Sequence, residues 1–208
     1  MGAATEPFPA PWQLHGDGLV ALYPPAPERI SPPDRAAYRG GPSALMLVNY
    51  AQSDVGPYDE LLYVAGFFQA GPLVRPRVTR ILVSSAASAV WGRRNWGLPK
   101  EVAQFEWGAS MLWVRQGGAF LAQLAWKATG PALPLSSHLL PASFGTLAQP
   151  TELGFLLTRP RARGWARPAR LTCANVEPGL FPDVGATRPH LCLRIERFQM
   201  VFPVPERI

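Results

Sequence analysis

The stretch that decides the fold reads WGRRNWGLPK and covers residues 91–100. Its polar residues stand among two Trp, two Gly and one Pro, a composition that is typical of neither a regular strand nor a regular helix. Gly92 and Gly97 permit backbone angles that other residues resist, and Pro99 fixes its own φ. We therefore predict a turn that holds Lys100 at a defined angle between large aromatic rings.

Lysine is rare in this chain, which makes Lys100 stand out. Two lysines, Lys100 and Lys127, stand against eighteen arginines. A guanidinium stays protonated, whereas an amine can lose its proton and act as a nucleophile or a base. Lys100 is therefore the first candidate for a catalytic residue. Lys127 follows Trp126 on a predicted strand and is interpreted as a solvated side chain.

The motif GRRNWGLPK, followed by EVAQF, resembles the signature of the acetoacetate decarboxylase-like superfamily. In that superfamily a Gly-x-Pro-Lys turn carries the lysine that forms a Schiff base with a keto acid. The Arg-Asn-Trp before the turn is more similar to an uncharacterised branch than to the true decarboxylases. The resemblance implies a lyase that uses a Lys100 imine on a small keto acid, by decarboxylation or by an aldol or dehydration reaction. It implies neither a metal nor an organic cofactor, because the imine is itself the electron sink.

Two glutamates complete the candidate catalytic set. The YDE triplet at residues 58–60 matches the family's Tyr-x-Glu, which implies that Glu60 lies in the pocket as the acid/base or orienting group. Glu101 stands where the true decarboxylases have a second lysine. A carboxylate that faced the pocket there would raise the pKa of Lys100 and favour its ammonium form. Alternatively Glu101 points away from the pocket or serves as a general acid/base.

Substrate-binding candidates lie in the same motif. Arg93 or Arg94 is suited to bind a substrate carboxylate in bidentate fashion, and Trp96 to form part of a low-dielectric wall. Structural salt bridges are an equal alternative for the two arginines, and packing is the alternative for Trp96.

The resemblance fails at one position. The family's catalytic enzymes carry an arginine just after a strand tyrosine, whereas Pro24 follows Tyr23 here. Arg29 is near in sequence, but its position in the chain does not assign it this role.

Short apolar or alternating runs, separated by turns rich in Gly and Pro, recur along the chain. We expect a short helix at residues 84–90, a two-residue hairpin turn at Gly117-Gly118, and a loop at 131–150. Strands are expected at residues 19–23, 44–50, 60–68, 78–83, 102–107, 111–116, 120–127, 152–158, 170–176 and 192–202. This pattern predicts a mainly β (β-rich α+β) fold in one domain over residues 1–208, with 1–11 as an extended arm. The resemblance implies a closed, cone-shaped antiparallel or mixed barrel with peripheral strands and a few short helices.

The overall composition limits which cellular compartment and which binding partners we expect. Hydrophobic residues make up 48% of the chain and charged residues 16%, which is typical of a globular protein. The sequence has no apolar run of the roughly 18 residues that a membrane helix needs. The N-terminal residues lack a secretory signal pattern, so we expect a cytoplasmic protein with Cys173 and Cys192 reduced. The three histidines are scattered, and no metal site is predicted.

The net charge of +6 is densest around an Arg-rich stretch that we interpret as a loop over residues 159–170. Charge runs of this kind usually stay solvated, and no nucleic-acid-binding signature is present, so nucleic acid is not an expected partner. Binding of an anionic polymer through this loop remains a third, weaker hypothesis.

Two functional hypotheses follow. The first is the Schiff-base lyase, with a small keto acid or carboxylate as its ligand. The second is a non-catalytic barrel protein that binds a small apolar or carboxylate ligand. The resemblance also implies a homo-oligomer, a dimer or larger. The two hypotheses differ in whether Lys100 reacts covalently.

Overall fold

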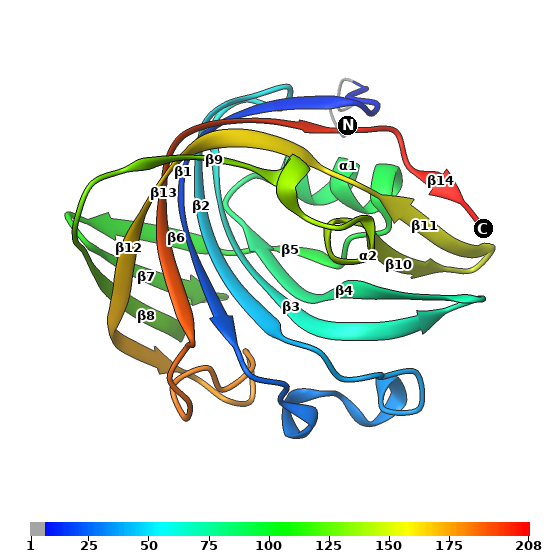
Figure 1. The fold of residues 1–208 in the computed structure, drawn as a ribbon, viewed down its shortest axis with the longest axis horizontal. Coiled ribbons are helices and arrows are strands. Elements are labelled where there is room, and N and C mark those ends of the chain that lie inside the picture. Colours follow the sequence, from blue (N-terminus) through cyan, green and yellow to red (C-terminus); the bar gives the residue numbers. More distant parts are fainter. Residues whose placement is uncertain (1–6) are drawn as a thin grey trace.

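The computed structural model describes residues 7–208, and strands dominate it (Figure 1). The predicted mainly β fold with few helices is therefore confirmed. The helical elements are η1 (Pro27–Arg29), η2 (Pro32–Asp34), α1 (Ala86–Trp96), η3 (Ser137–Leu139) and α2 (Ala142–Gly145). The strands are β1 (Trp12–Tyr23), β2 (Ser43–Ser53), β3 (Tyr58–Ala70), β4 (Leu73–Val83), β5 (Lys100–Val102), β6 (Gln104–Gly108), β7 (Met111–Gln116), β8 (Ala119–Ala128), β9 (Leu133–Ser136), β10 (Leu147–Thr151), β11 (Gly154–Thr158), β12 (Arg161–Val176), β13 (Leu191–Phe202) and β14 (Glu206–Arg207). Among the helices of this described part, none has the length and apolar character needed to cross a membrane.

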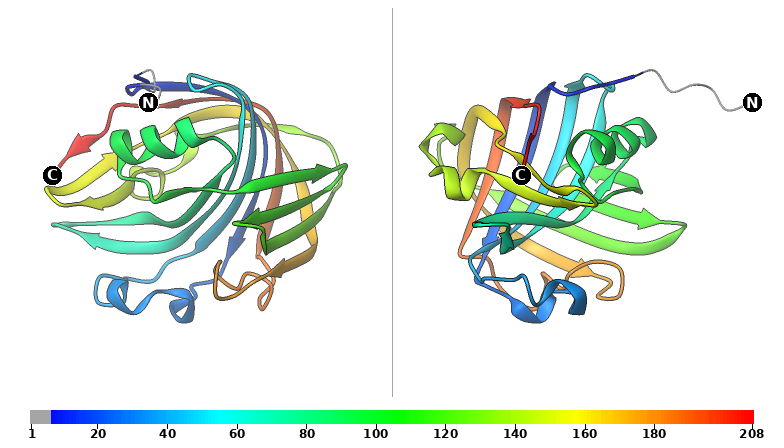
Figure 2. Two further views of the ribbon diagram at one scale, coloured as in Figure 1. Left: turned by 180° about the vertical axis from the view of Figure 1, so that it is seen from behind. Right: turned by 90° about the vertical axis from the view of Figure 1, so that its right-hand side faces the viewer.

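One large, strongly curved sheet runs in the order β5-β4-β3-β2-β1-β13-β12-β8-β7-β6, and β9 pairs with β12. Its ladders are antiparallel except for the parallel pair of β4 and β5, so the sheet is mixed. The edge strands β5 and β6 follow each other in the chain with only Ala103 between them. Within residues 7–208, however, no ladder joins these two edges, and the predicted closed barrel is not confirmed. Figure 2 shows the curl of this open sheet from behind and from the side.

The first strand, β1, is longer than the predicted 19–23. The prediction began too late because two glycines interrupt the apolar pattern of the strand. Gly16 and Gly18 flank an irregularity in the pairing of β1 with β13. A Cβ atom at Gly16 would lie 2.0 Å from the Asn49 carbonyl oxygen of β2. These glycines therefore permit close strand contact, although in the sequence they resemble a strand boundary.

Two apolar cores lie on opposite faces of the central strands, because successive residues of a strand point to opposite faces. The core that we call the β-core joins β1–β4 to β7 and β8 through residues such as Leu19, Leu61, Leu112 and Leu124. The core that we call the helix core lies against α1 and contains Trp12, Tyr50, Tyr58, Ile81 and Trp96. Figure 1 shows α1 and β6–β8 on opposite sides of the central strands.

The predicted turn at residues 91–100 is largely wrong, because α1 continues to Trp96. Ser85 caps the helix by accepting a hydrogen bond from the Ser88 amide. Gly97, with φ of 66°, ends the helix in the left-handed conformation that favours glycine. The prediction holds only for the three residues before Lys100, where Pro99 stops any further helix. A mid-helix glycine at position 92 misled the sequence interpretation.

The predicted Arg-rich loop at 159–170 is also wrong, since most of it belongs to β12. Arginine and small residues alternate there, so that Arg161 and Arg163 lie on the exposed face of the strand. Gly164 accommodates a register shift against β13, where a Cβ atom would meet Phe198 at 2.9 Å. The sequence interpretation took this glycine and the neighbouring prolines for loop residues.

Two smaller predictions have opposite outcomes. The Gly117-Gly118 hairpin turn is confirmed, with φ of 57° and 83° between β7 and β8. The predicted loop at 131–150 is wrong in part, because it contains β9, η3, α2 and most of β10. The expected arm at residues 1–11 falls largely outside the described residues.

Candidate active site around Lys100

Lys100 and Glu60 meet in the helix core although forty residues separate them in the chain. Glu60 lies on β3 opposite Val83 of β4, and Lys100 lies on β5 beside Ile81 of β4. Their side chains reach across β4, and the distance from Lys100 Nζ to Glu60 Oε2 is 2.8 Å. The two side chains are only 4% and 6% exposed, so this is a buried ion pair.

The Lys100 amine has further partners on its other sides. Nζ donates a hydrogen bond to Ser88 Oγ of α1 at 3.0 Å. It also lies 5.1 Å from the centre of the Tyr58 ring and 5.8 Å from that of Trp12. An aromatic face within about 6 Å attracts a cation. A carboxylate, a hydroxyl and two rings therefore surround the amine.

Two buried tyrosines, Tyr50 and Tyr58, lie close to the ion pair, and Tyr50 contacts its carboxylate directly. Tyr50 Oη donates to Glu60 Oε1 at 3.1 Å. Burial, reinforced by the Glu60 charge, raises the pKa of Tyr50 and of Tyr58 well above the usual tyrosine value. Both phenols therefore stay neutral at physiological pH, and Tyr50 serves Glu60 as a hydrogen-bond donor.

Gly92 explains how α1 packs directly on the lysine. A Cβ atom at this position would lie 2.5 Å from Lys100 Cδ and 2.8 Å from Cε. The missing side chain thus leaves space for the lysine stem. The same glycine that interrupted the helical pattern in the sequence is a packing residue of the site.

Glu101 lies away from the amine, because alternation along β5 turns it to the other face. Its carboxylate pairs with Arg80 and accepts a hydrogen bond from Gln116 Nε2 at 2.7 Å. Partial burial by itself raises the pKa of Glu101, but the Gln116 hydrogen bond and the Arg80 charge outweigh it and leave the pKa below its usual value. The Glu101 side chain is 47% exposed.

The substrate-binding candidates have other partners in this structure. Arg93 Nη1 donates to the main-chain oxygen of Lys100 at 2.7 Å, and Arg94 lies over the Trp91 ring at 5.1 Å. Both arginines are exposed. Trp96 packs edge-on against Trp12, with ring centres 4.9 Å apart, and its Nε1 donates to the Pro203 oxygen. Of the residues predicted for the site, Lys100 and Glu60 are brought into direct side-chain contact.

Sequence reasoning missed several members of this site. Tyr58 stood within the quoted Tyr-x-Glu triplet, and its position two residues before Glu60 on a strand was a signal that it shares the same face. Tyr50, at the end of an apolar run, and Ser88, in an Ala-rich helix, carried no such signal. Their roles depend on the pairing of β2 with β3 and on the position of α1.

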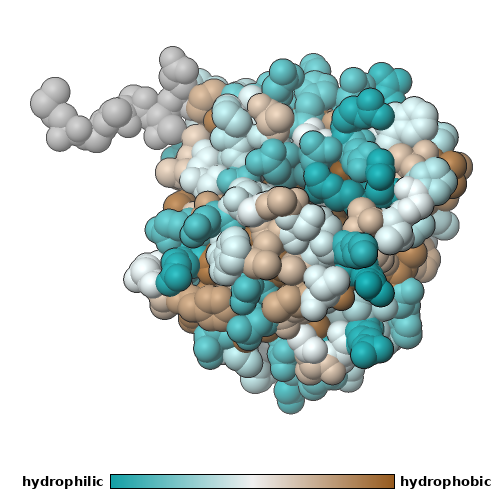
Figure 3. All heavy atoms as spheres, turned by 90° about the vertical axis from the view of Figure 1, so that its left-hand side faces the viewer, coloured by the Kyte–Doolittle hydropathy of each residue, from teal (hydrophilic) through white to brown (hydrophobic). Residues whose placement is uncertain are grey.

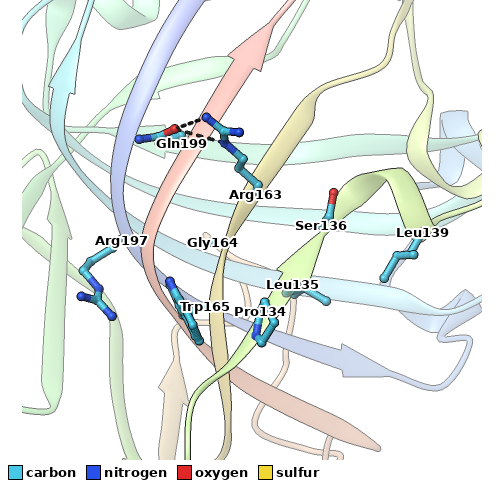
Figure 4. Close-up of a pocket in the computed structure, with 9 residues that line it drawn as sticks. All are labelled: Pro134, Leu135, Ser136, Leu139, Arg163, Gly164, Trp165, Arg197 and Gln199. Atoms are coloured by element: carbon cyan, nitrogen blue, oxygen red, sulfur yellow. Dashed lines mark hydrogen bonds between the residues drawn. The ribbon is translucent and has the colours of Figure 1, made fainter.

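A surface hollow lies elsewhere, between β9, β12 and β13. It has a volume of about 530 Å³, and its lining includes Arg163, Trp165, Arg197 and Gln199 (Figure 4). Arg163 donates to the Gln199 side-chain oxygen, and the Arg197 guanidinium lies 5.9 Å from the Trp165 ring. On the side of the molecule seen in Figure 3, hydrophilic residues are interspersed with hydrophobic ones. The Lys100 site is not part of this hollow.

Metal binding finds no support in the described part of the chain. Within residues 7–208, no three His, Cys, Asp or Glu side chains gather closely enough to hold a metal ion. The arrangement around Lys100 instead offers an amine, a carboxylate and a hydroxyl, which are groups suited to proton transfer and covalent catalysis.

Solved structures with the same fold are acetoacetate decarboxylases and related enzymes. Acetoacetate decarboxylase from Legionella pneumophila superposes with a TM-score of 0.68 at 14% identity, over 96% of this chain and 88% of that chain. An acetoacetate decarboxylase-like enzyme from Sphingomonas wittichii gives a TM-score of 0.67 at 14% identity, over 100% and 96%. The enduracididine biosynthesis enzyme MppR, complexed with pyruvate, gives 0.64 at 14% identity, over 99% and 93%. The chain therefore has an acetoacetate decarboxylase-like fold.

Comparison by sequence finds similarity over a smaller part of the chain than comparison by structure does. No model of a protein family matches the chain. A 61-residue segment is 38% identical to Protein NEOXANTHIN-DEFICIENT 1 of Oryza sativa subsp. japonica, covering 29% of this chain. That segment spans a fifth of the length of the rice protein.

Proposed function

We propose that this protein is a Schiff-base-forming lyase that acts on a small keto acid through Lys100. The observation that carries the proposal is the buried contact of 2.8 Å between the Lys100 amine and the Glu60 carboxylate. The lysine is the one in the Gly-x-Pro-Lys motif, and the fold is similar to that of acetoacetate decarboxylase and of acetoacetate decarboxylase-like enzymes. The pyruvate bound to MppR supports a small 2-keto acid as the substrate class.

The chemistry begins with a proton transfer. Lys100 passes one ammonium proton to Glu60, and the neutral amine attacks the substrate ketone carbon to give a carbinolamine. Loss of water, with Glu60 returning the proton to the leaving hydroxyl, forms the imine. The protonated imine then accepts the electron pair released when a carbon–carbon or an α carbon–hydrogen bond breaks. The resulting enamine takes up a proton at carbon to give an imine again, and addition of water to this imine releases the product and restores the amine.

The neighbouring residues have positioning roles in this scheme. Ser88 fixes the direction of the amine, and Tyr50 holds the Glu60 carboxylate through its second oxygen. Because partners surround the amine, a substrate carbonyl has to displace either the Ser88 contact or one of the rings of Trp12 and Tyr58. Arg93 is the nearer candidate for the substrate carboxylate, since it already binds the main chain of Lys100. In our proposal, it exchanges that contact for the substrate.

Borohydride trapping tests the proposal directly. We would incubate the protein with pyruvate, acetoacetate and 2-oxobutyrate, reduce with borohydride, and identify the modified peptide by mass spectrometry. The expected result is a mass gain on Lys100 that is absent from Lys100→Ala. Lys127→Ala serves as the matched control, because Lys127 is exposed on β8 and should leave the adduct unchanged. A well-folded sample that gives no adduct at neutral and alkaline pH would overturn the proposal for these acids.

A second candidate function is non-catalytic ligand binding by the same fold. The observation that favours it is the complete set of partners around the Lys100 amine, which a substrate would have to displace. In that case Lys100 fastens α1 to the sheet. Absence of trapping, together with reversible binding of a carboxylate, is the result expected from this second function.

A further inference from the structure

Arg29 is a buried cation in the β-core, on the face of the sheet opposite to Lys100. Its side chain is only 4% exposed, because η1 turns it inward at the end of β1. The carboxylate nearest to it is Glu28, with an Nε to Oε1 distance of 3.9 Å, and the Glu28 side chain is 68% exposed. Arg29 Nη1 has no hydrogen-bond partner in the described chain, residues 7–208. The fold thus buries a guanidinium without a buried counter-charge.

The hydroxyls of three tyrosines in the same region also lack a hydrogen-bond partner within the described residues. Tyr23 and Tyr63 are completely buried, and Tyr38 is half-buried. Their Oη atoms make no hydrogen bond to any other part of residues 7–208. Unpaired buried polar atoms are rare in folded proteins, and each calls for an explanation.

The four residues lie near one another at one end of the β-core. The Arg29 guanidinium is 5.5 Å from the centre of the Tyr23 ring. Burial raises the pKa of Tyr23, the Arg29 charge counteracts this effect, and Tyr63 adds to it, so all three are within electrostatic reach. Tyr63 also packs edge-on against Phe181 of the segment 177–190. Figure 1 shows that segment (orange) and the segment that carries η1 (blue) at the same end of the molecule.

The chemistry of these groups defines what they would bind. A guanidinium only donates hydrogen bonds, and a phenol hydroxyl can donate one as well. An occupant with acceptor atoms would satisfy these donors, and one negative charge would match the Arg29 guanidinium. Buried apolar residues such as Ile30, Leu45 and Phe181 surround the donors, so the remainder of the occupant should be apolar.

We propose that Arg29, Tyr23 and Tyr63 form a binding site for the carboxylate of a small apolar monocarboxylic acid, with Tyr38 at its edge. Arginine pairs with a planar carboxylate through two parallel hydrogen bonds. The site is distinct from the Lys100 site, because Tyr63 belongs to the β-core and Glu60, three residues earlier on the same strand, points toward the helix core. Its ligand need not react, and it does not have to be the keto acid of the proposed lyase.

Calorimetric titration with butyrate tests this site, beside the uncharged isostere butyramide and inorganic phosphate. We expect saturable binding of butyrate, little or no binding of butyramide, and phosphate weaker than butyrate. Arg29→Gln should weaken butyrate binding by about tenfold or more, since it removes a hydrogen bond to a charged group. Arg39→Gln is the matched control, because Arg39 is an exposed arginine of the same region.

Two further variants keep the test decisive. Tyr63→Phe removes one oxygen and keeps the ring, so it should fold and still weaken butyrate several-fold. The double variant Glu60→Gln with Lys100→Met removes the Lys100 amine without leaving a buried charge unpaired, and it should bind butyrate as the wild type does, which separates this site from the proposed lyase. The proposal is overturned if butyrate fails to bind, if phosphate binds more tightly, or if Tyr63→Phe and Arg29→Gln bind butyrate normally. Loss of butyrate binding in the double variant would overturn it as well.

Discussion

The two faces of the central sheet each bury a cation, and they treat it in opposite ways. In the helix core, Lys100 has the Glu60 carboxylate at 2.8 Å and the Ser88 hydroxyl at 3.0 Å. In the β-core, Arg29 has only the exposed Glu28 at 3.9 Å. A buried charge is costly unless it is paired and hydrogen-bonded. The protein supplies a buried counter-ion to Lys100 and, among the described residues, none to Arg29, and in our proposal a ligand carboxylate takes that place beside Arg29.

Removing the Glu60 charge should have the largest effect. Glu60→Gln leaves the buried Lys100 ammonium without its counter-charge, and we expect it to lower the free energy of unfolding by about 3–5 kcal/mol. Arg29→Gln, measured without ligand, removes a cation that has no buried partner, and should cost far less. Urea unfolding at pH 7 measures both changes. Equal losses of unfolding free energy in the two variants would contradict the view that Lys100 has a buried counter-ion and Arg29 has none in the described part of the chain.

A double variant separates the ion pair from simple packing. Glu60→Gln combined with Lys100→Met removes both charges and keeps a long apolar stem at position 100. We expect it to recover most of the stability lost in Glu60→Gln alone, because replacing a whole buried pair is far cheaper than breaking it.

Gly92→Ala should have the next largest effect. The added methyl would lie 2.5 Å from Lys100 Cδ, so either the helix or the lysine stem has to move. Overpacking of this kind typically costs about 1–3 kcal/mol. The variant should also reduce borohydride trapping, because it displaces the amine from Ser88.

Gly108→Ala is the matched control for this helix glycine. Its nearest neighbour would be Trp113 at 3.5 Å, an ordinary contact, and its φ is not in the left-handed region. If both variants lost equal stability in urea unfolding, the specific packing of α1 on Lys100 would be disproved.

Much of the helix-core site could be predicted from the sequence, and little of the β-core site could. Lys100 and Glu60 lie in two short motifs, so local patterns identified both. Arg29 sits among prolines in an irregular segment, and its burial depends on how η1 turns over the end of β1. No local pattern records that a charged side chain lacks a partner, because this is a property of the assembled core.

The errors about secondary structure have a common physical cause. Gly92 and Gly164 were interpreted as breakers, yet each lies where another segment approaches too closely for a side chain. Tertiary contact, rather than backbone flexibility, explains both glycines. The closed barrel is a different case, since it was implied by resemblance: the edges at Lys100–Val102 and Gln104–Gly108 adjoin in the chain without forming a ladder in the described residues.

Alkaline pH offers a smaller test of the helix core. Tyr50 and Tyr58 have pKa values well above the usual one because of burial and the Glu60 charge. Above pH of about 10 the unfolded chain loses these phenol protons while the folded protein keeps them. Stability should therefore fall by about 1.4 kcal/mol per pH unit for each such phenol. Tyr58→Phe should make this decline less steep, whereas an unchanged slope in urea unfolding between pH 10 and 11 would contradict it.

The smallest effect is expected from the carboxylate next to Lys100 in the chain. Glu101 pairs with Arg80 and Gln116 on the far side of β5, and its pKa is lowered, so it stabilises the fold at neutral pH. That contribution should disappear as the pH falls below the usual glutamate range and through the lowered pKa. Because the side chain is 47% exposed, Glu101→Gln should cost less than about 1 kcal/mol at pH 7, and the difference from wild type should shrink as the pH is lowered.

The same variant decides what Glu101 does for the chemistry. If it only anchors Arg80, Glu101→Gln will trap keto acids on Lys100 as well as the wild type does, with an unchanged pH profile. If trapping falls sharply while stability hardly changes, Glu101 acts on the amine in spite of its position on the other face. The electrostatic separation of the two faces of β5 would then be incomplete.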